Sequence, residues 1–319
     1  MIRATAPSRL HFGLFNPGAD EPWPNLDGAP AVPGRRFGGV GLMLCDPGLQ
    51  VAAEPAAEWA AAGPLAGRAL EFARRFAATV PDLPPHRLVV ERAAPEHVGL
   101  GTGTQLGLAV AQALAVAAGH ADWGPVELAR RVGRGERSAI GLHGFAGGGF
   151  LVDGGKRGDG AGPLLLRERF PDDWRVVLVL PAAGSGLHGA AERRAFERLL
   201  GAPRPGLAEV LCRLTLLGML PALREGDCRA FGEALYDFNA RVGEAFAVAQ
   251  GGRYAGPLAA AVVQEVRRLG LAGAGQSSWG PAAFAVAESE SRAAEVAARL
   301  QDHFGGVVMV SVTAAFNGR

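Results

Sequence analysis

The 319-residue sequence predicts an α+β protein with two domains. The length allows two medium domains, and the hydrophobic fraction of 49% is enough to build a core in each. The first fifty residues consist mainly of strand-like segments, whereas the chain after Arg167 combines core strands with several helices. We therefore expect one domain at residues 1–160 and an α+β domain at residues 161–319.

The first domain is expected to begin with two strands, at residues 2–15 and 37–44, where apolar residues alternate or run continuously. Residues 16–36 between them are rich in Pro, Gly and Asp, which indicates a disordered loop or a functional flap. Helical spacing then predicts a helix at residues 64–80, and "HRLVVER" predicts a strand at residues 86–92.

The glycine-dense middle of the chain and the second domain continue this pattern. A helix is expected at residues 125–135, with Pro125 in its first turn, and helices are also expected between about 189 and 270 and at 289–303. Buried strands are expected in "GGFLVDGG" (148–155), "WRVVLVLP" (174–181), "PAAFAVAE" (281–288) and "GGVVMVSVT" (305–313).

Charge and cysteine content exclude several classes of protein. A net charge of +1 argues against nucleic acid and anionic membranes as partners. Three cysteines without CxxC spacing exclude a disulfide framework and a thiolate zinc site, and they fit a reducing compartment. No signal peptide and no apolar run of membrane-spanning length is present, so we expect a cytoplasmic protein without membrane or nucleic-acid partners.

The segment "PEHVGLGTGT" (95–104) lies between a predicted strand and an apolar helix. A helix that begins in a glycine-rich turn presents free N–H groups and a favourable dipole to an anion such as phosphate. The segment is not a Walker A loop, because the only lysine is Lys156, and it lacks the sixth-position glycine of GxGxxG. From spacing alone, a phosphate site and an ordinary capped turn remain equally good interpretations.

The same segment resembles the second signature of the GHMP kinase superfamily, P-x-x-x-G-L-G-S-S, whose loop wraps the phosphates of ATP. "APSRLHFG" (6–13) is similar to the N-terminal signature, and "GAGQSSWGP" (273–281) lies where the C-terminal glycine-rich signature falls. The resemblance implies a GHMP-kinase-like fold, with an N-terminal ribosomal-protein-S5-like domain and a C-terminal ferredoxin-like domain.

One departure from these kinases concerns the acidic residue that interacts with the attacking hydroxyl. The corresponding stretch is "GERSAIG", and Gly141 occupies the acidic position. Arg137 and His143 lie nearby instead, which favours holding an anionic substrate over deprotonating a hydroxyl.

The strings "SRLHFGLFNPG", "GLGTGTQLGLAVA", "GERSAIG" and "GQSSWGP" closely resemble the β-ribofuranosylaminobenzene 5'-phosphate synthase family within this superfamily. That family belongs to tetrahydromethanopterin biosynthesis. The resemblance implies decarboxylating transfer from phosphoribosyl pyrophosphate to 4-aminobenzoate or 4-hydroxybenzoate, with release of CO2 and pyrophosphate. It also implies Mg²⁺ as cofactor and a homodimer.

Such a reaction requires two anions to be held in register while pyrophosphate leaves, which suits arginine, histidine, hydroxyl and glycine N–H groups. The expected catalytic residues are Arg9, His11, Arg137 and His143. The expected substrate and phosphate ligands are Ser8, Arg35, Arg36, Gly99, Gly101, Thr102, Gly103, Thr104, Gln105, His188, Gln276, Ser277 and Ser278.

Each candidate also has a purely structural explanation. Arg9 and His11 lie on the same side of a strand, and that side faces either the site or the solvent. His143 is either a ligand or a satisfied buried histidine, and Trp279 is expected to pack rather than to stack on substrate. Asp153 and Glu192 are the carboxylates considered for Mg²⁺, although most such groups are surface or capping residues. Two rival functions stay open: an ATP-dependent GHMP small-molecule kinase and a non-catalytic binding protein.

Overall fold

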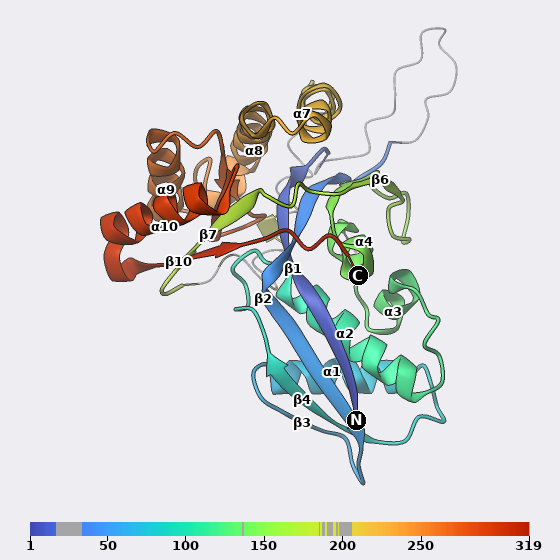
Figure 1. Ribbon diagram of the computed structural model, residues 1–319. Helices are drawn as coiled ribbons and strands as arrows, with labels where there is room; N and C mark the ends of the chain where they lie inside the picture. Colours follow the sequence, from blue (N-terminus) through green and yellow to red (C-terminus); the bar gives the residue numbers. More distant parts are fainter. Residues whose placement is uncertain are drawn as a thin grey trace, which may run out of the picture.

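Two β-sheets organise the part of the chain that the structure, a computed structural model, describes. The described residues are 1–16, 34–135, 137–184, 186, 189, 194–195, 197 and 206–318. The first sheet has the order β3-β4-β2-β5-β6, with β1 paired to β2 (Figure 1). Its strands are β1 (Ile2–Leu14), β2 (Gly39–Pro55), β3 (Ala60–Ala62), β4 (His86–Arg92), β5 (Phe150–Asp153) and β6 (Leu164–Glu168).

The long antiparallel pair of β1 and β2 runs through both halves of the molecule (Figure 1). Irregular pairing interrupts β1 between Ala6 and Ser8 and again between His11 and Gly13. A bulge re-aims the side chains that follow it, so these interruptions decide which face of β1 each polar residue takes.

Four helices accompany the first sheet: α1 (Ala66–Ala77), α2 (Thr102–Ala117), α3 (Pro125–Arg131) and α4 (Ile140–Gly147). Eleven residues of α2 are buried, because alanine, leucine and valine occupy nearly all of its sides. This central helix packs between the sheet and the other helices, and its N-terminus points to the junction with the second sheet (Figure 1).

The second sheet has the order β10-β7-β9-β8, and every neighbouring pair is antiparallel. Its strands are β7 (Arg175–Pro181), β8 (Gly273–Gln276), β9 (Ala283–Ala287) and β10 (Val308–Thr313). Its helical elements are α6 (Leu207–Arg213), the π-helix η1 (Leu214–Met219), α7 (Leu220–Glu225), α8 (Cys228–Gln250), α9 (Pro257–Arg268), α10 (Glu290–Phe304) and the short 3-10 helix η2 (Gly305–Val307).

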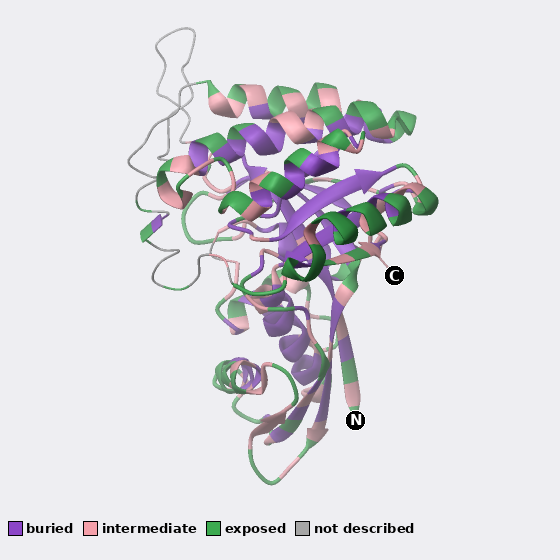
Figure 2. Ribbon diagram, turned by 90° about the vertical axis from the view of Figure 1, so that its left-hand side faces the viewer, coloured by how far each residue is buried: buried purple, intermediate pink, exposed green. Residues whose placement is uncertain are grey.

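The helix α8 lies against both β8 and β1 and so connects the two sheets. One continuous cluster of buried residues includes Phe12 of β1, Phe238 of α8 and Phe284 of β9. The rings of Phe12 and Phe284 are 5.2 Å apart, although they belong to different sheets. Figure 2 shows this arrangement as a buried interior, with exposed residues on the outer faces of the helices.

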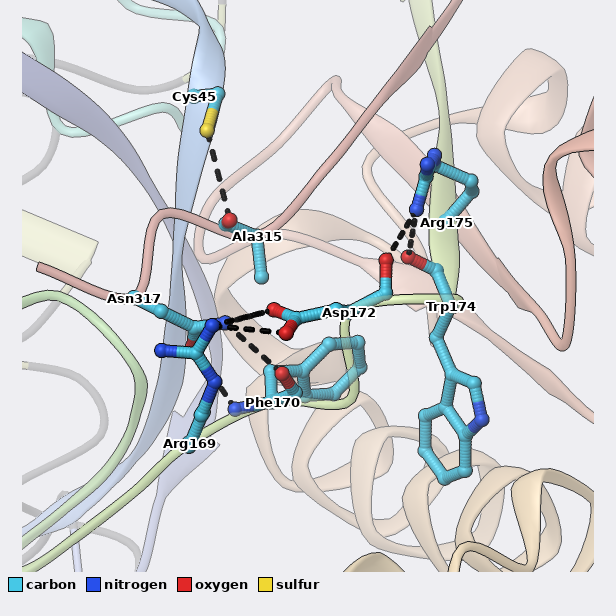
Figure 3. A network of polar contacts seen from close by, with 8 residues as sticks. All are labelled: Cys45, Arg169, Phe170, Asp172, Trp174, Arg175, Ala315 and Asn317. Atoms are coloured by element: carbon cyan, nitrogen blue, oxygen red, sulfur yellow. Dashed lines mark hydrogen bonds and ion pairs between the residues drawn. The ribbon is translucent and has the colours of Figure 1, made fainter.

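The C-terminal segment after β10 returns to the first sheet. The Cys45 N–H donates to Ala314 at 3.0 Å, and the Phe316 N–H donates to Met43 at 2.8 Å. The side chain of Asn317 accepts from the Phe170 N–H and donates to the Phe170 carbonyl, both at 2.9 Å (Figure 3). The end of the chain therefore fastens the two sheets to each other.

The α+β prediction is confirmed, as are the strands predicted within residues 2–15, 37–44 and 86–92. The strand β8 at residues 273–276, directly before Ser277 and Ser278, is not among the predicted strands. The helix expected to reach residue 135 ends at Arg131. The division at residues 160 and 161 stays a prediction. Within the described ranges, no helix combines the length and apolarity needed to cross a bilayer.

Candidate functional site

A cavity of about 420 Å³ lies where β1, the head of α2, α8 and the turn after β8 meet. This volume is in the range of small-molecule sites, which often lie between two domains. Strand β1 supplies Arg9, His11, Phe12, Gly13 and Leu14 to the lining of the cavity, and the apolar side chains of Leu10, Phe12 and Leu14 also belong to the core. The site is therefore built on a central strand rather than on surface loops.

Backbone hydrogen bonds fix this strand against the two glycine-rich signatures. The Arg9 N–H donates to the Leu100 carbonyl at 2.9 Å. The His11 N–H donates to Ser277 Oγ, and the Ser278 N–H donates to the His11 carbonyl, both at 3.0 Å. Three segments that are distant in the sequence thus meet around Arg9 and His11, two alternate residues of β1.

The loop before α2 brings the helix N-terminus to the cavity. Gly101 is the N-cap and has a left-handed backbone with φ of 72°, which glycine adopts at little cost. No side chain caps the helix, because its N-cap residue is a glycine. The two threonines of the first turn bond elsewhere: Thr102 Oγ1 donates to the Pro95 carbonyl at 2.7 Å, and Thr104 Oγ1 accepts from Arg134 at 3.0 Å. The dipole and N–H groups of this end favour an anion.

Three arginines lie against the N-terminus of α2, namely Arg9, Arg68 and Arg134, and Arg137 lines the same cavity. The Arg9 side chain lies against Gly101, where a Cβ atom would come within 3.2 Å of Nε. The Arg68 guanidinium lies against Gly103 and also pairs with Glu96. None of the described residues that line the cavity is a carboxylate. The electrostatics of this end therefore suit phosphate or carboxylate ligands.

His11 contributes a neutral imidazole. Burial lowers its pKa well below the usual value, and the neighbouring charge of Arg9 lowers it further. Its Nε2 atom is buried and has no hydrogen-bond partner among the described residues. A neutral ring nitrogen beside the cavity is available to a ligand either as donor or as acceptor.

The structure brings many of the sequence-predicted residues into the cavity. They are Arg9, His11, Gly99, Gly101, Thr102, Gly103, Thr104, Arg137, Gln276 and Ser278.

Three other predicted residues, Ser8, Gln105 and Ser277, are buried beside the cavity and bond to backbone instead of lining it. Ser8 Oγ donates to the Pro47 carbonyl. Gln105 Nε2 donates to Gly141 and Ser277 Oγ donates to Gly99, both at 2.7 Å. These groups hold the loop and α4 in position, which is a positioning role rather than a direct contact.

The remaining predicted residues lie elsewhere. Arg35 donates to the Gly155 carbonyl at 2.9 Å, and Arg36 pairs through its backbone with Lys156. His143 Nε2 bonds to the Gly162 carbonyl at 2.8 Å, so it matches the satisfied histidine considered as its alternative. The structure does not bring these three side chains to the cavity, and His188 lies outside the described residues.

Asp153, a carboxylate considered for Mg²⁺, is fully buried and accepts three hydrogen bonds. Its oxygens accept from the Ala139 N–H at 2.5 Å, the Gly155 N–H at 2.9 Å and Ser138 Oγ at 3.2 Å. Burial raises the pKa of this carboxyl, although the three donors oppose the shift. Asp153 therefore supports the segment that carries Arg137. Glu192 lies outside the described residues, and those that are described contain no cluster of three metal-binding side chains.

Gly141, at the position that is acidic in GHMP kinases, faces the same region. A Cβ atom there would lie 3.2 Å from Gln105 Nε2 and 3.6 Å from Arg9 Cδ. An acidic side chain at this position would meet the cationic side chain on which the cavity is built.

Two curated relatives are similar over nearly the whole chain. Both bear the name Beta-ribofuranosylphenol 5'-phosphate synthase. The protein from Methanothermobacter thermautotrophicus is 31% identical over 89% of this chain and 88% of its own length. The protein from Archaeoglobus fulgidus is 32% identical over 95% of this chain and 93% of its own length. The chain belongs to the beta-ribofuranosylphenol 5'-phosphate synthase family.

The fold of this family member is the GHMP kinase fold. The model for "GHMP kinases C terminal" matches residues 219–306. Homoserine kinase from Cytophaga hutchinsonii superposes with a TM-score of 0.68 at 15% identity, covering 99% of this chain and 95% of that one. Mevalonate kinase from L. major, solved in complex with R-mevalonate, gives 0.66 at 13% identity, covering 98% and 96%. The expected GHMP-like fold and the expected family are therefore confirmed.

Several residues of the synthase cavity are not apparent from the sequence. Arg68 comes from the partly exposed side of α1, and nothing in its spacing distinguishes it from other surface arginines. Arg134 has a usable signal, because it lies between Gly133 and Gly135, which both have positive φ. Asn239 of α8 also lines the cavity, but it falls among the buried residues of that helix, and its spacing does not distinguish it from them.

Proposed function

We propose that this protein transfers the phosphoribosyl group of phosphoribosyl pyrophosphate to 4-hydroxybenzoate or 4-aminobenzoate with loss of CO2. The products are a β-ribofuranosyl-arene 5'-phosphate, CO2 and pyrophosphate, in tetrahydromethanopterin biosynthesis. The observation that carries this proposal is the cavity, which is lined by Arg9, Arg68, Arg134 and Arg137 together with the open N-terminus of α2. The name of the two relatives, a synthase of a ribofuranosylphenol 5'-phosphate, supports it.

The chemistry needs charge stabilisation rather than a protein nucleophile. The bond between the anomeric carbon and pyrophosphate breaks, and the leaving group takes the electron pair. The ring carbon that carries the carboxylate forms the new bond to the anomeric carbon. The carboxylate then leaves as CO2, and the electrons of the broken bond restore the aromatic ring.

In this scheme Arg9, Arg68 and the N–H groups of the 99–104 loop stabilise the departing pyrophosphate. Arg137, held on the segment that Asp153 supports, orients an anionic group of substrate. Neutral His11 donates or accepts one hydrogen bond without adding charge beside the developing cation.

An ATP-dependent small-molecule kinase is the alternative function. The helix head would suit nucleotide phosphates equally well. Gly141 argues against it, because the place of the usual acidic group is taken by a glycine that packs near Arg9. The relatives' shared name also favours the synthase.

We propose that Mg²⁺ takes part in the reaction as an ion bound to the substrate phosphoribosyl pyrophosphate. Mg²⁺ in proteins prefers carboxylate and phosphate oxygens. The described cavity residues offer cations, amides and hydroxyls, and this donor set does not fit an ion held by protein ligands alone. We also infer a cytoplasmic location and a homodimer, which rest on the sequence resemblance and cysteine content; light scattering checks the latter.

The decisive experiment counts CO2 released from carboxyl-labelled 4-hydroxybenzoate or 4-aminobenzoate in the presence of phosphoribosyl pyrophosphate, with and without Mg²⁺. Release that requires phosphoribosyl pyrophosphate is expected. Formation of ADP from ATP and a small alcohol, without CO2 from either benzoate, would show that the protein is a kinase.

Arg9→Ala tests the site itself. We expect kcat/KM to fall by about a hundredfold or more, because a stabilising cation is lost from the transition state. Arg3→Ala is the matched control on the same strand, since Arg3 is exposed and pairs with Glu91 at the surface. Equal activities of the two variants would contradict the assignment of Arg9.

A further inference from the structure

The cavity has two chemically different ends, and strand β1 runs from one end to the other. Arg9 lies at the cationic end, against the loop before α2. Gly13 lies at the other end, where an added Cβ atom would come within 2.5 Å of Val242 and 2.9 Å of Phe238. Four residues of strand, with one irregularity between His11 and Gly13, separate the two ends by at most roughly 13 Å. This length accommodates a charged group and an aromatic ring side by side.

One face of α8 forms the wall of the second end. Val242, Phe246 and Gln250 are spaced four residues apart, so they share a side of the helix, and all three line the cavity. The ring of Phe246 meets the ring of Trp279 edge to face, with centroids 4.8 Å apart and planes at 65°. The cation at this end, Arg253, is engaged by Glu244 in an ion pair.

The geometry points to this wall as the binding site of the aromatic ring of the benzoate. This inference rests on the proposed function and assigns the second substrate to a place within the cavity. An arene gains from apolar burial and from edge-to-face contact with another ring, whereas a phosphate gains from neither of these contacts. The carboxylate-bearing carbon then faces Arg9 and the ribose, and the para substituent points along α8.

Gln250 lies where a para substituent would end. Its Nε2 atom donates to the Arg253 carbonyl at 2.9 Å and to the Gly243 carbonyl at 3.4 Å, which fixes the orientation of the amide. Its Oε1 atom receives a long contact of 3.4 Å from Gln276 Nε2. A carbonyl oxygen has two lone pairs, so Gln250 retains capacity for a further donor. A para hydroxyl and a para amine both supply one.

Phe246→Ala tests the ring site. The dissociation constant of 4-hydroxybenzoate, measured by calorimetry, should rise by about tenfold or more, while that of phosphoribosyl pyrophosphate should stay within about twofold. Val248→Ala, an exposed position on the same helix, is the matched control and should change neither constant. Phe246→Leu retains apolar volume and keeps the test valid if the alanine variant does not fold.

Gln250→Met tests the para contact. The unmodified protein should prefer 4-hydroxybenzoate over 4-methylbenzoate, which has a similar size and no donor, and the variant should lose most of this preference.

Two results would overturn the ring assignment. One is an unchanged dissociation constant for 4-hydroxybenzoate in the Phe246 variants. The other is an equal loss of affinity for 4-hydroxybenzoate and for phosphoribosyl pyrophosphate in those variants. If the unmodified protein releases no CO2, the proposed function fails instead, whereas direct benzoate binding still reports on the ring site.

Discussion

His11 is 4% exposed and lies two residues from Arg9 on β1. Burial and the adjacent cation both lower its pKa, so the folded protein keeps this imidazole neutral where an unfolded chain would protonate it. Below about pH 6.5, the ordinary histidine value, the unfolded state binds a proton that the folded state does not. The stability that depends on neutral His11 is therefore present above that pH and decreases as the pH falls toward the folded pKa.

This balance gives a prediction for His11→Gln. The free energy of unfolding, measured with urea at pH 7 and pH 5, should fall less on acidification in the variant than in the unmodified protein, by about 1 kcal/mol or more. His120, which stacks on Trp123 away from the cavity, serves as the control in His120→Gln. An equal acid sensitivity in all three proteins would show that His11 titrates normally.

At the scale of elements, α8 is held to both sheets by Asn239. Asn239 Nδ2 donates to the carbonyl of Phe12 at 2.7 Å and to that of Gln276 at 2.9 Å. Asn239 Oδ1 accepts from the Gln276 N–H at 2.9 Å. One buried amide thus joins three backbone groups of β1 and β8, and it fixes the wall of the cavity relative to the strand.

Asn239→Ala should leave these three buried backbone groups without their partner. Buried polar groups that lose their hydrogen bonds cost about 1–3 kcal/mol each, so we expect a loss of about 3 kcal/mol in the free energy of unfolding. Asp237→Ala, which removes only an exposed pair with Arg241 on the same helix, should cost less than about 1 kcal/mol. Urea denaturation of the two variants distinguishes these outcomes, and similar losses would contradict the joining role.

At the scale of the whole molecule, the C-terminal segment links β10 to the first sheet (Figure 3). Asn317→Ala removes the partner of both backbone groups of Phe170. We expect a loss of about 2 kcal/mol and a fall of several degrees in the Tm. Arg169→Ala, which breaks only an exposed pair with Asp172, should leave the Tm nearly unchanged. A single unfolding transition should persist, because the core is continuous between the sheets.

The sequence predicts much of the fold because the buried strands are continuous apolar runs and α2 follows a distinctive glycine loop. It predicts the cavity less well, because a polar residue on a strand is turned toward the site or the interior by pairing that sequence does not show. Arg9 and His11 follow the simple alternation between the two irregularities of β1, and both reach the cavity. Ser8 and Ser277 were expected as ligands, yet both are buried and donate to backbone carbonyls.

The alternation along β1 also bears on how this protein can acquire new substrates. Arg9 and His11 share a strand with Leu10 and Phe12, whose side chains are 0% and 1% exposed in the core. Substitutions in this strand affect both the stability of the core and the residues of the cavity, so we expect few of them to be tolerated. This constraint from the core does not apply at the end of the apolar wall on α8, where Gln250 precedes the exposed turn at Gly251. Changes in acceptor preference should therefore accumulate at the end of α8, while the phosphate-binding half stays constant.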